Sequence, residues 1–374
     1  MQGFSTPPFY VKLSLNLITI ALICLCIYLA SDIVMPIFFS IVLAILLVPL
    51  ENWLTSKKLP RVAAMLISIF LVLLFIVGII YFLSAQVANF IGDLPKIKEQ
   101  LNTHWHTVQQ WISRTFHFTY KEQNKAIEAA TDNMKTSAGG TSVVGATALS
   151  AIGSLAYIIL LPLYTFLIMY YRSLIKRFLI ESFSDKHKES VQEVLAESKT
   201  IIQRYMVGLL IEMAIVTTLN AVGFFIVGID YAIFLAVLVA ILNMIPYVGM
   251  LVAAILCLLI TLSTSNDVAD VLWVAVVLAV VQAVDNNFLM PYVVSSKVRI
   301  NALVSIIGVL VGGALAGVSG MFLSIPGVAV LKTIFERVDG LRQWGMLMGD
   351  ELSMLSPGKR KKIEQRETSK KKQS

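Results

Sequence analysis

Long, uninterrupted runs of apolar residues fill most of this 374-residue sequence, and they constrain its fold more than any other feature. An α-helix needs about 20 apolar residues to cross the hydrocarbon core of a bilayer, and several runs have this length. The runs are apolar on every side and do not alternate, so they predict helices rather than the strands of a membrane β-barrel. Only 14% of the residues are charged, whereas soluble proteins carry about 25%. The sequence therefore predicts an all-α, polytopic membrane protein.

Six of the runs have the length of one membrane-spanning helix. They cover residues 12–30, 34–50, 62–85, 146–170, 206–228 and 271–290. The first run is not followed by a small-residue cleavage site, so we interpret it as a retained span and not as a signal peptide.

Two further runs, 231–262 and 301–332, are too long for one straight span and too short for two spans joined by a polar loop. Pro246 interrupts the first run near its middle, and the glycine-rich stretch 312–320 and Pro326 interrupt the second. Each run can form one long, kinked helix. Alternatively, each can form a re-entrant hairpin, in which two half-helices enter and leave on the same side of the membrane.

The distribution of positive charge distinguishes these two topologies, because short cytoplasmic loops carry an excess of lysine and arginine. With two hairpins and a cytoplasmic N-terminus, none of the short outer loops contains lysine or arginine; these loops are residues 31–33, 228–230 and 263–270. With two single spans, Asp267 and Asp270 would move inside while Lys297 and Arg299 would move outside, which opposes the rule. The sequence therefore favours two hairpins, with both termini on the cytoplasmic side.

The hairpin topology makes residues 206–332 an inverted repeat. Helix 206–228 is followed by a hairpin that enters from outside, and helix 271–290 is followed by a hairpin that enters from inside. Secondary transporters repeatedly use this architecture, with broken helices that meet near the bilayer midplane. We therefore expect residues 206–332 to be a transport unit that moves past a fixed scaffold, as an elevator does.

The remaining segments complete the expected organisation. It comprises three scaffold spans in residues 1–85, an extracytoplasmic insert of amphipathic helices in 86–142, the fourth span and a cytoplasmic helix in 143–205, and a basic cytoplasmic tail in 333–374 that is disordered from about residue 356. The net charge of +7 resides mostly in the tail and the inner loops. It therefore indicates membrane orientation, with the lipid bilayer as a partner, and no nucleic-acid partner.

Polar residues within the apolar segments are the candidates for a binding site. Glu212 and Asp285 are ionisable, and an ionisable side chain inside a span is so costly that it is a functional candidate by default. Four amide side chains accompany them: Asn220, Asn243, Gln282 and Asn286. Structural roles stay open, because Glu212 is close enough to the end of its span to reach the interface and Asp285 can cap a helix.

The sequence contains no catalytic or cofactor motif of the kinds HExxH, Walker loop, GxSxG or CxxC. His104 and His106 are two residues apart, and such positions do not face each other on a helix, so they do not predict a metal site. We expect no enzyme activity, no catalytic residue, no metal and no cofactor. Active transport would then be coupled to a gradient of Na⁺ or H⁺.

Two stretches of the sequence carry a family resemblance. LNMIPYVGMLVAAI, residues 242–255, resembles the central signature of the autoinducer-2 exporter family of bacterial permeases. A second signature of that family resembles residues 285–332, DNNFLMPYVVSSKVRINALVSIIGVLVGGALAGVSGMFLSIPGVAVLK. The similarity extends over the chain up to about residue 340.

The resemblance implies an oligomeric transporter of the bacterial inner membrane, with about eight membrane segments, that exports autoinducer-2 or a related small polar solute. It also implies a substrate-pathway role for the positions that match the motifs: Pro246, Gly249, Asp285, Pro291, Gly312, Gly313, Gly317, Gly320 and Pro326. For the glycines, plain helix packing is the alternative.

Two alternative functions stay open. Some members of the family are associated with sodium/proton antiport, so exchange of sodium or lithium for protons is the first alternative. A non-transporting membrane scaffold, in which the outer insert is the functional part, is the second.

Overall fold

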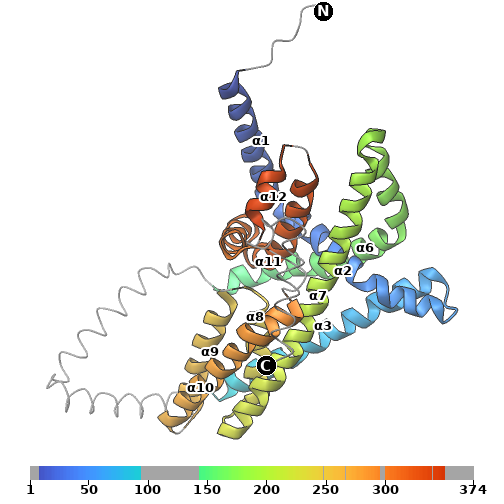
Figure 1. The fold of residues 1–374 in the computed structure, drawn as a ribbon. Helices are drawn as coiled ribbons and strands as arrows, with labels where there is room; N and C mark the ends of the chain where they lie inside the picture. The colour runs from blue at the N-terminus through green and yellow to red at the C-terminus, as the bar shows by residue number, and fades with distance from the viewer. Residues whose placement is uncertain are drawn as a thin grey trace, which may run out of the picture.

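The computed structural model describes residues 8–93, 143–246, 248–265, 267–294, 300–338 and 340–349, and within them every regular element is a helix (Figure 1). Six of these helices are long and apolar enough to cross a membrane. The prediction of an all-α, polytopic membrane protein is confirmed. Most of the predicted outer insert, residues 94–142, lies outside the described residues, as does the tail from residue 350.

In residues 8–93 and 143–181, the structure describes four long helices: α1 (Phe9–Leu29), α2 (Ser31–Ser56), α3 (Arg61–Gly92) and α6 (Val143–Glu181). Buried side chains of α2, α3 and α6 pack into one core, which contains Leu47, Met65 and Met169. Helix α1 extends away from this core (Figure 1). Residues 86–92 belong to α3, so this helix continues past the predicted start of the insert.

Helix α7 (Asp185–Val227) is a single helix of 43 residues, although its sequence changes from polar to apolar near residue 206. The polar segment 171–205 is therefore not one separate helix. A turn at residues 182–184 divides it between the end of α6 and the start of α7. Gly228 ends α7 in the left-handed region, with φ of 83°, where glycine is favoured.

The first broken run folds as a hairpin of two short helices, α8 (Ala232–Asn243) and α9 (Val248–Thr264). Pro246 lies in the interruption, where its missing N–H and its ring prevent the helix from continuing. Helix α9 starts so close to the end of α8 that a Cβ on Gly249 would lie 1.7 Å from the carbonyl oxygen of Leu242. Only glycine fits at this contact.

The second broken run, α11 (Ala302–Arg337), also reverses direction. Ala316 and Gly317 have non-helical backbone angles, and Gly317 has φ of 58°. A Cβ on Gly320 would lie 1.9 Å from the carbonyl oxygen of Gly312, whereas residues eight apart in a straight helix are about 12 Å apart. The two halves of α11 therefore pack against each other, and both long runs are hairpins rather than single kinked helices.

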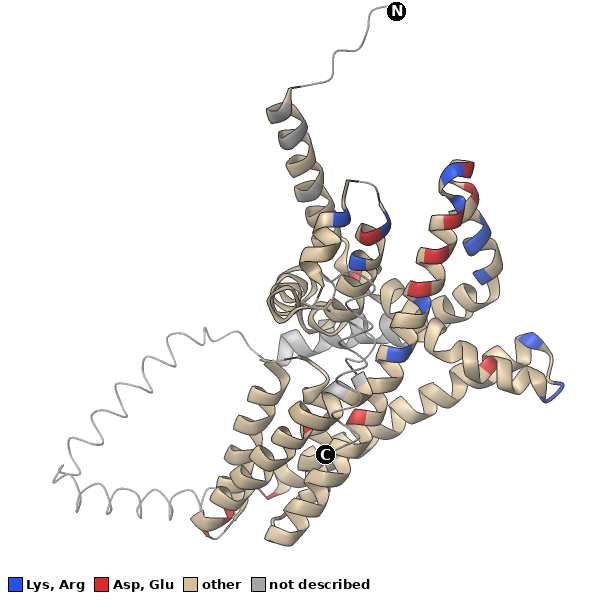
Figure 2. Cartoon of the chain, viewed as in Figure 1, with Lys and Arg blue, Asp and Glu red and all other residues tan. Residues whose placement is uncertain are grey.

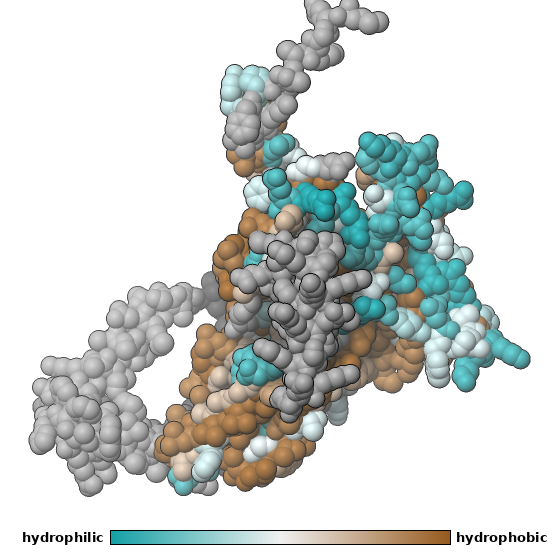
Figure 3. Space-filling model, viewed as in Figure 1, coloured by the Kyte–Doolittle hydropathy of each residue, from teal (hydrophilic) through white to brown (hydrophobic). Residues whose placement is uncertain are grey.

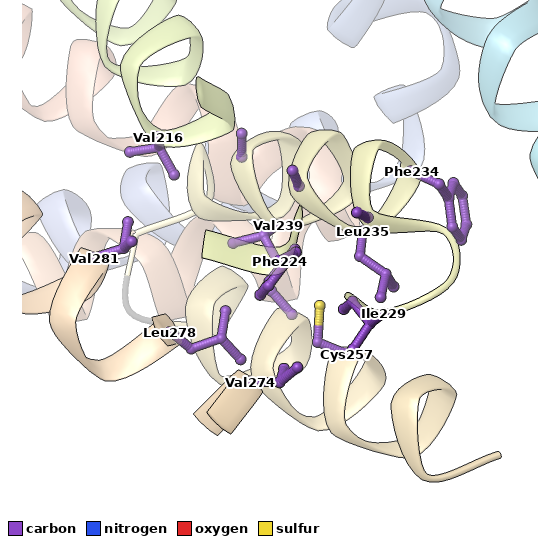
Figure 4. Packing of buried hydrophobic residues seen from close by; sticks show 14 residues of the cluster. Val216, Phe224, Ile229, Phe234, Leu235, Val239, Cys257, Val274, Leu278 and Val281 are labelled. Atoms are coloured by element: carbon purple, nitrogen blue, oxygen red, sulfur yellow. The ribbon is translucent and has the colours of Figure 1, made fainter. Parts of the chain in front are cut away.

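The order helix, hairpin, helix, hairpin that was predicted for residues 206–332 is present. Helix α10 (Val268–Val284) follows the first hairpin and continues as the wider π-helix η1 (Asp285–Val294), and the short α12 (Arg342–Met348) packs against α11. The first hairpin packs between α7 and α10. Figure 4 shows the shared core, in which the side chains of Phe224, Leu235 and Val239 converge with Cys257 and Val274.

Apolar side chains cover much of the outer surface of these helices (Figure 3). Phe70, Ile226 and Leu272, for example, expose between 63% and 81% of their surface. Exposure of apolar faces of this extent to water is unfavourable, whereas their exposure to the hydrocarbon of a bilayer is not.

A buried ion pair joins the first three packed helices. Glu51 of α2 is 1% exposed, and its carboxylate lies 3.4 Å from Nε of Arg61 on α3 and 2.5 Å from Nη1 of Arg172 on α6. Two guanidinium groups compensate for the burial of this one carboxylate.

We predict that Gly320→Ala destabilises the protein by about 1–3 kcal/mol, because the new methyl group overlaps the backbone at Gly312. The measurement is thermal unfolding of the purified protein in detergent. Gly327→Ala is the matched control, since Gly327 lies in the same half of α11 with nothing within 4 Å of an added Cβ. Equal stability of the two variants would contradict the close packing of the hairpin.

We also predict that Glu51→Gln lowers the free energy of unfolding by about 1–3 kcal/mol, because two arginines lose their carboxylate partner. The exposed pair of Arg177 and Glu181 provides the control, and Glu181→Gln should leave the stability nearly unchanged. Denaturant titration of both variants checks this. A Glu51 variant as stable as wild type would mean that the ion pair contributes nothing.

Candidate functional site

Three polar side chains that are distant in the sequence meet between α7, α8 and η1. The amide nitrogen of Asn243 donates to Oε1 of Glu212 at 3.2 Å and to Oδ2 of Asp285 at 3.1 Å. Glu212 comes from the middle of α7, Asn243 is the last residue of α8, and Asp285 is the first residue of η1. One amide thus bridges two carboxyl groups.

Both carboxyl groups are withdrawn from solvent. Glu212 is 3% exposed and Asp285 is 2% exposed. Oε2 of Glu212 and Oδ1 of Asp285 have no hydrogen-bond partner among the described residues. A buried polar atom without a partner is unfavourable, so each carboxyl group retains the capacity to bind a proton or a ligand.

Local backbone structure explains why these side chains meet. Helix α8 ends at Asn243 because of the break around Pro246, and this places the Asn243 amide at the tip of the hairpin. Asp285 lies where α10 widens into the π-helix η1, and π-helical turns inside helices occur frequently at functional sites. Two irregularities of the backbone therefore position two of the three residues.

The cluster lines a cavity of about 700 Å³. Six of the residues predicted from the sequence lie on its wall: Glu212, Asn243, Pro246, Gln282, Asp285 and Asn286. Gln282 and Asn286 are one helical turn apart, and the Gln282 side chain donates to Oδ1 of Asn286 at 3.0 Å. The wall therefore presents carboxyl and amide groups together.

Two other predicted residues, Asn220 and Gly249, are not on the wall of this cavity. Asn220 is fully buried, and its amide donates to the carbonyl of Val216 on its own helix at 2.9 Å. Gly249 packs against the end of α8. Pro291 is within η1, and its side chain lies outside the described part of the structure.

The glycines of the second hairpin have packing roles. Gly312, Gly313 and Gly320 face the opposite half of α11, and Gly317 forms its bend. Pro326 is buried in the second half, next to Ile325, which lines the cavity. The cavity wall contains residues from both halves of α11 but not from its glycine-rich tip.

Several residues on the cavity wall were not predicted from the sequence. They are Tyr205, Met250, Leu251, Ala254, Met290, Ile300, Ala302, Ser305 and Ile325. The position of Tyr205 could have been inferred, since it precedes Glu212 by seven residues and therefore shares its helix face. The others are ordinary residues of apolar segments, and only the folded hairpins place them together.

Within the described parts of the chain, no group of three or more His, Cys, Asp or Glu residues is arranged to hold a metal ion. The donor set of the cluster is two carboxylates and one amide. Oxygen donors of this kind suit protons and hard cations.

Comparison with known proteins gives a consistent result over most of the chain. The model of the AI-2E family of transporters matches residues 17–340. A protein of Bacillus subtilis (strain 168), named "Putative transport protein YrrI", is 27% identical over 322 residues, which cover 81% of this chain and 86% of the relative.

A protein of Escherichia coli (strain K12), named "Putative transport protein YhhT", is 24% identical over 346 residues, which cover 90% of this chain and 93% of the relative. The family match includes both hairpins and every residue of the Glu212, Asn243 and Asp285 cluster. With several apolar helices of membrane-spanning length and this match, the chain is a multi-pass membrane protein that belongs to the AI-2E transporter family.

Proposed function

We propose that this protein is a secondary transporter of the bacterial inner membrane that exports autoinducer-2 or a related small polar solute. In this proposal the solute occupies the cavity, and Glu212, Asn243 and Asp285 bind the coupling ion, H⁺ or Na⁺. The observation that carries the proposal is the pair of buried carboxyl groups bridged by one amide at a helix break.

The size and chemistry of the cavity support a small polar solute. Its volume of about 700 Å³ lies within the range of about 300–1,000 Å³ that is usual for ligand sites. Gln282, Asn286 and Ser305 add donors and acceptors for hydroxyl groups, while Met250 and Ile325 provide apolar walls. Transporters with inverted repeats bind their substrates at discontinuous helices in the same way.

The packing of the chain supports movement of a transport unit past a scaffold. Helices α7 to α10 share one core, and α2, α3 and α6 share another. A third cluster, in which Tyr205 of α7 and Ile325 of α11 pack near Leu46 of α2, lies between them. We propose an elevator-like displacement along this boundary.

The orientation and assembly that we propose rest on charge and exposure. Lysine and arginine gather at the α2–α3 and α6–α7 turns (Figure 2), which supports a cytoplasmic position for both turns and hence for both termini. The exposed apolar faces of α1 and α3 are suited to lipid and to contacts in a homo-oligomer.

Sodium(lithium)/proton antiport is the second candidate function. It is favoured by one observation, which is that Oε2 of Glu212 and Oδ1 of Asp285 are both buried without partners among the described residues. Two such oxygens suit the alternating binding of a proton and a small cation.

We predict that Asp285→Asn reduces coupled transport by about tenfold or more, because the substitution removes one of the two charges that bind the ion. The measurement is uptake into proteoliposomes, which compares autoinducer-2 with Na⁺ and Li⁺ under an imposed proton gradient. Asp230→Asn is the matched control, since Asp230 is exposed and lies outside the cavity.

The substrates in this assay separate the two candidate functions. Transport of autoinducer-2 that requires the gradient and is lost in Asp285→Asn supports coupled export. Flux of Na⁺ or Li⁺ without any transport of autoinducer-2 would show that the function is antiport and not export. Full activity of Asp285→Asn in every assay would contradict both functions.

We predict that Asn243→Ala raises the concentration of Na⁺ needed for half-maximal transport by about fivefold to tenfold, because one alanine removes both amide contacts that hold the two carboxyl groups in place. Asn287→Ala is the control, since the Asn287 amide donates only to the carbonyl of Ala283 at 2.7 Å. Unchanged ion dependence in Asn243→Ala would show that the bridge plays no part in ion binding.

A further inference from the structure

A second cavity, of about 670 Å³, lies between α2, α6 and α7. It shares no lining residue with the transport cavity. Its wall carries three basic side chains, Arg172, Lys176 and Lys199. It also carries apolar side chains, among them Ile45 and Val48 of α2. We call this second cavity the basic groove.

The charges of the basic groove are only partly neutralised by the residues that the structure describes. No acidic residue is on its wall. Lys176 and Lys199 are exposed and form no ion pair with any residue that the structure describes. Arg172 does pair with Glu51, but the same carboxylate also meets Arg61, so these three groups together keep a positive charge. An anion would therefore be attracted to these basic side chains.

The basic groove crosses a boundary between apolar and polar surface. Figure 3 shows hydrophobic surface over the body of the helices and hydrophilic surface over the projecting ends of α6 and α7, and Figure 2 shows the charged residues at those ends. Tyr170 and Tyr171 immediately precede Arg172 and lie in an edge-to-face contact. Tyrosines are enriched where a helix passes from hydrocarbon to lipid headgroups.

We infer that the basic groove binds one anionic phospholipid, with its phosphate at Arg172, Lys176 and Lys199 and an acyl chain along Ile45 and Val48. Basic pockets between membrane helices are known to bind the headgroups of anionic lipids. A free phosphate would contact only the three basic side chains and leave the apolar wall unoccupied. A zwitterionic lipid would place its own positive group beside three positive side chains, which is unfavourable. This site shares no residue with the transport cavity, so the inference can be tested without reference to the proposed transport function.

Native mass spectrometry of the full-length protein tests the inference, with phosphatidylglycerol, phosphatidylcholine or inorganic phosphate added as the probe. We expect a retained phosphatidylglycerol, weaker binding of phosphatidylcholine, and no competition by phosphate. The double variant Lys176→Gln with Lys199→Gln should raise the apparent Kd for phosphatidylglycerol by about 25-fold, since each lysine near an anionic headgroup contributes about fivefold.

The control carries the same change of charge outside the basic groove. Lys57→Gln with Lys186→Gln replaces two exposed lysines that do not line it and should leave the Kd unchanged. Ala196→Trp keeps every charge and fills the basic groove, because Ala196 is an exposed residue on its wall. This variant should also weaken phosphatidylglycerol binding, which separates loss of the site from loss of charge.

Four results would overturn the inference. The first is equal affinity of the protein for phosphatidylcholine and phosphatidylglycerol, and the second is equal affinity of the double variant and its control for phosphatidylglycerol. The third is displacement of the lipid by inorganic phosphate. The fourth is a change in oligomer mass in Ala196→Trp without a bound lipid. The third result would assign the basic groove to a free anion, and the fourth would assign it to a second copy of this chain.

Discussion

The interruption of a helix at membrane depth is the constraint on which the transport unit depends. In hydrocarbon, every backbone N–H and C=O must find a partner, and irregular backbone is tolerated only where protein buries it or where it lines a cavity. At the first break, the N–H groups of Met244, Ile245 and Gly249 donate to the carbonyls of Ile241, Leu242 and Ile245. The two arms of each hairpin also come into close backbone contact, at Gly249 in the first and at Gly312 and Gly320 in the second. Glycine is required there because any Cβ would overlap a carbonyl group.

The same interruption creates the candidate site. Because α8 stops at Asn243, its side chain is directed between α7 and η1 and not along a continuing helix. Its single amide then holds Glu212 and Asp285 together, two groups that would otherwise repel each other when both are ionised. The bridge leaves one oxygen of each carboxyl group without a partner, so the site is ordered before any ligand enters. Backbone irregularity and polar chemistry are thus parts of one arrangement.

The sequence predicted features that depend on composition and local chemistry, and it did not predict contacts between distant segments. Pro246 and the glycines of 312–320 mark both hairpins because their backbone effects are local. Glu212, Asn243 and Asp285 were recognised because polar residues are rare in apolar segments. Asn220 satisfied the same criterion, yet it bonds within its own helix. The change of polarity at residue 206 predicts a boundary there, but nothing in the backbone interrupts α7.

The continuity of α7 determines where the proposed motion can occur. Lys199 and Gln203 of this helix line the basic groove, and Tyr205 and Glu212 line the transport cavity. Thirteen residues of α-helix separate Lys199 from Glu212, which corresponds to about 20 Å. Because α7 is one continuous helix, movement of the proposed transport unit against α2 and α6 would also displace the part of α7 that lines the basic groove. A lipid bound there would lie on the sliding surface, and its affinity would differ between the two end states of the motion.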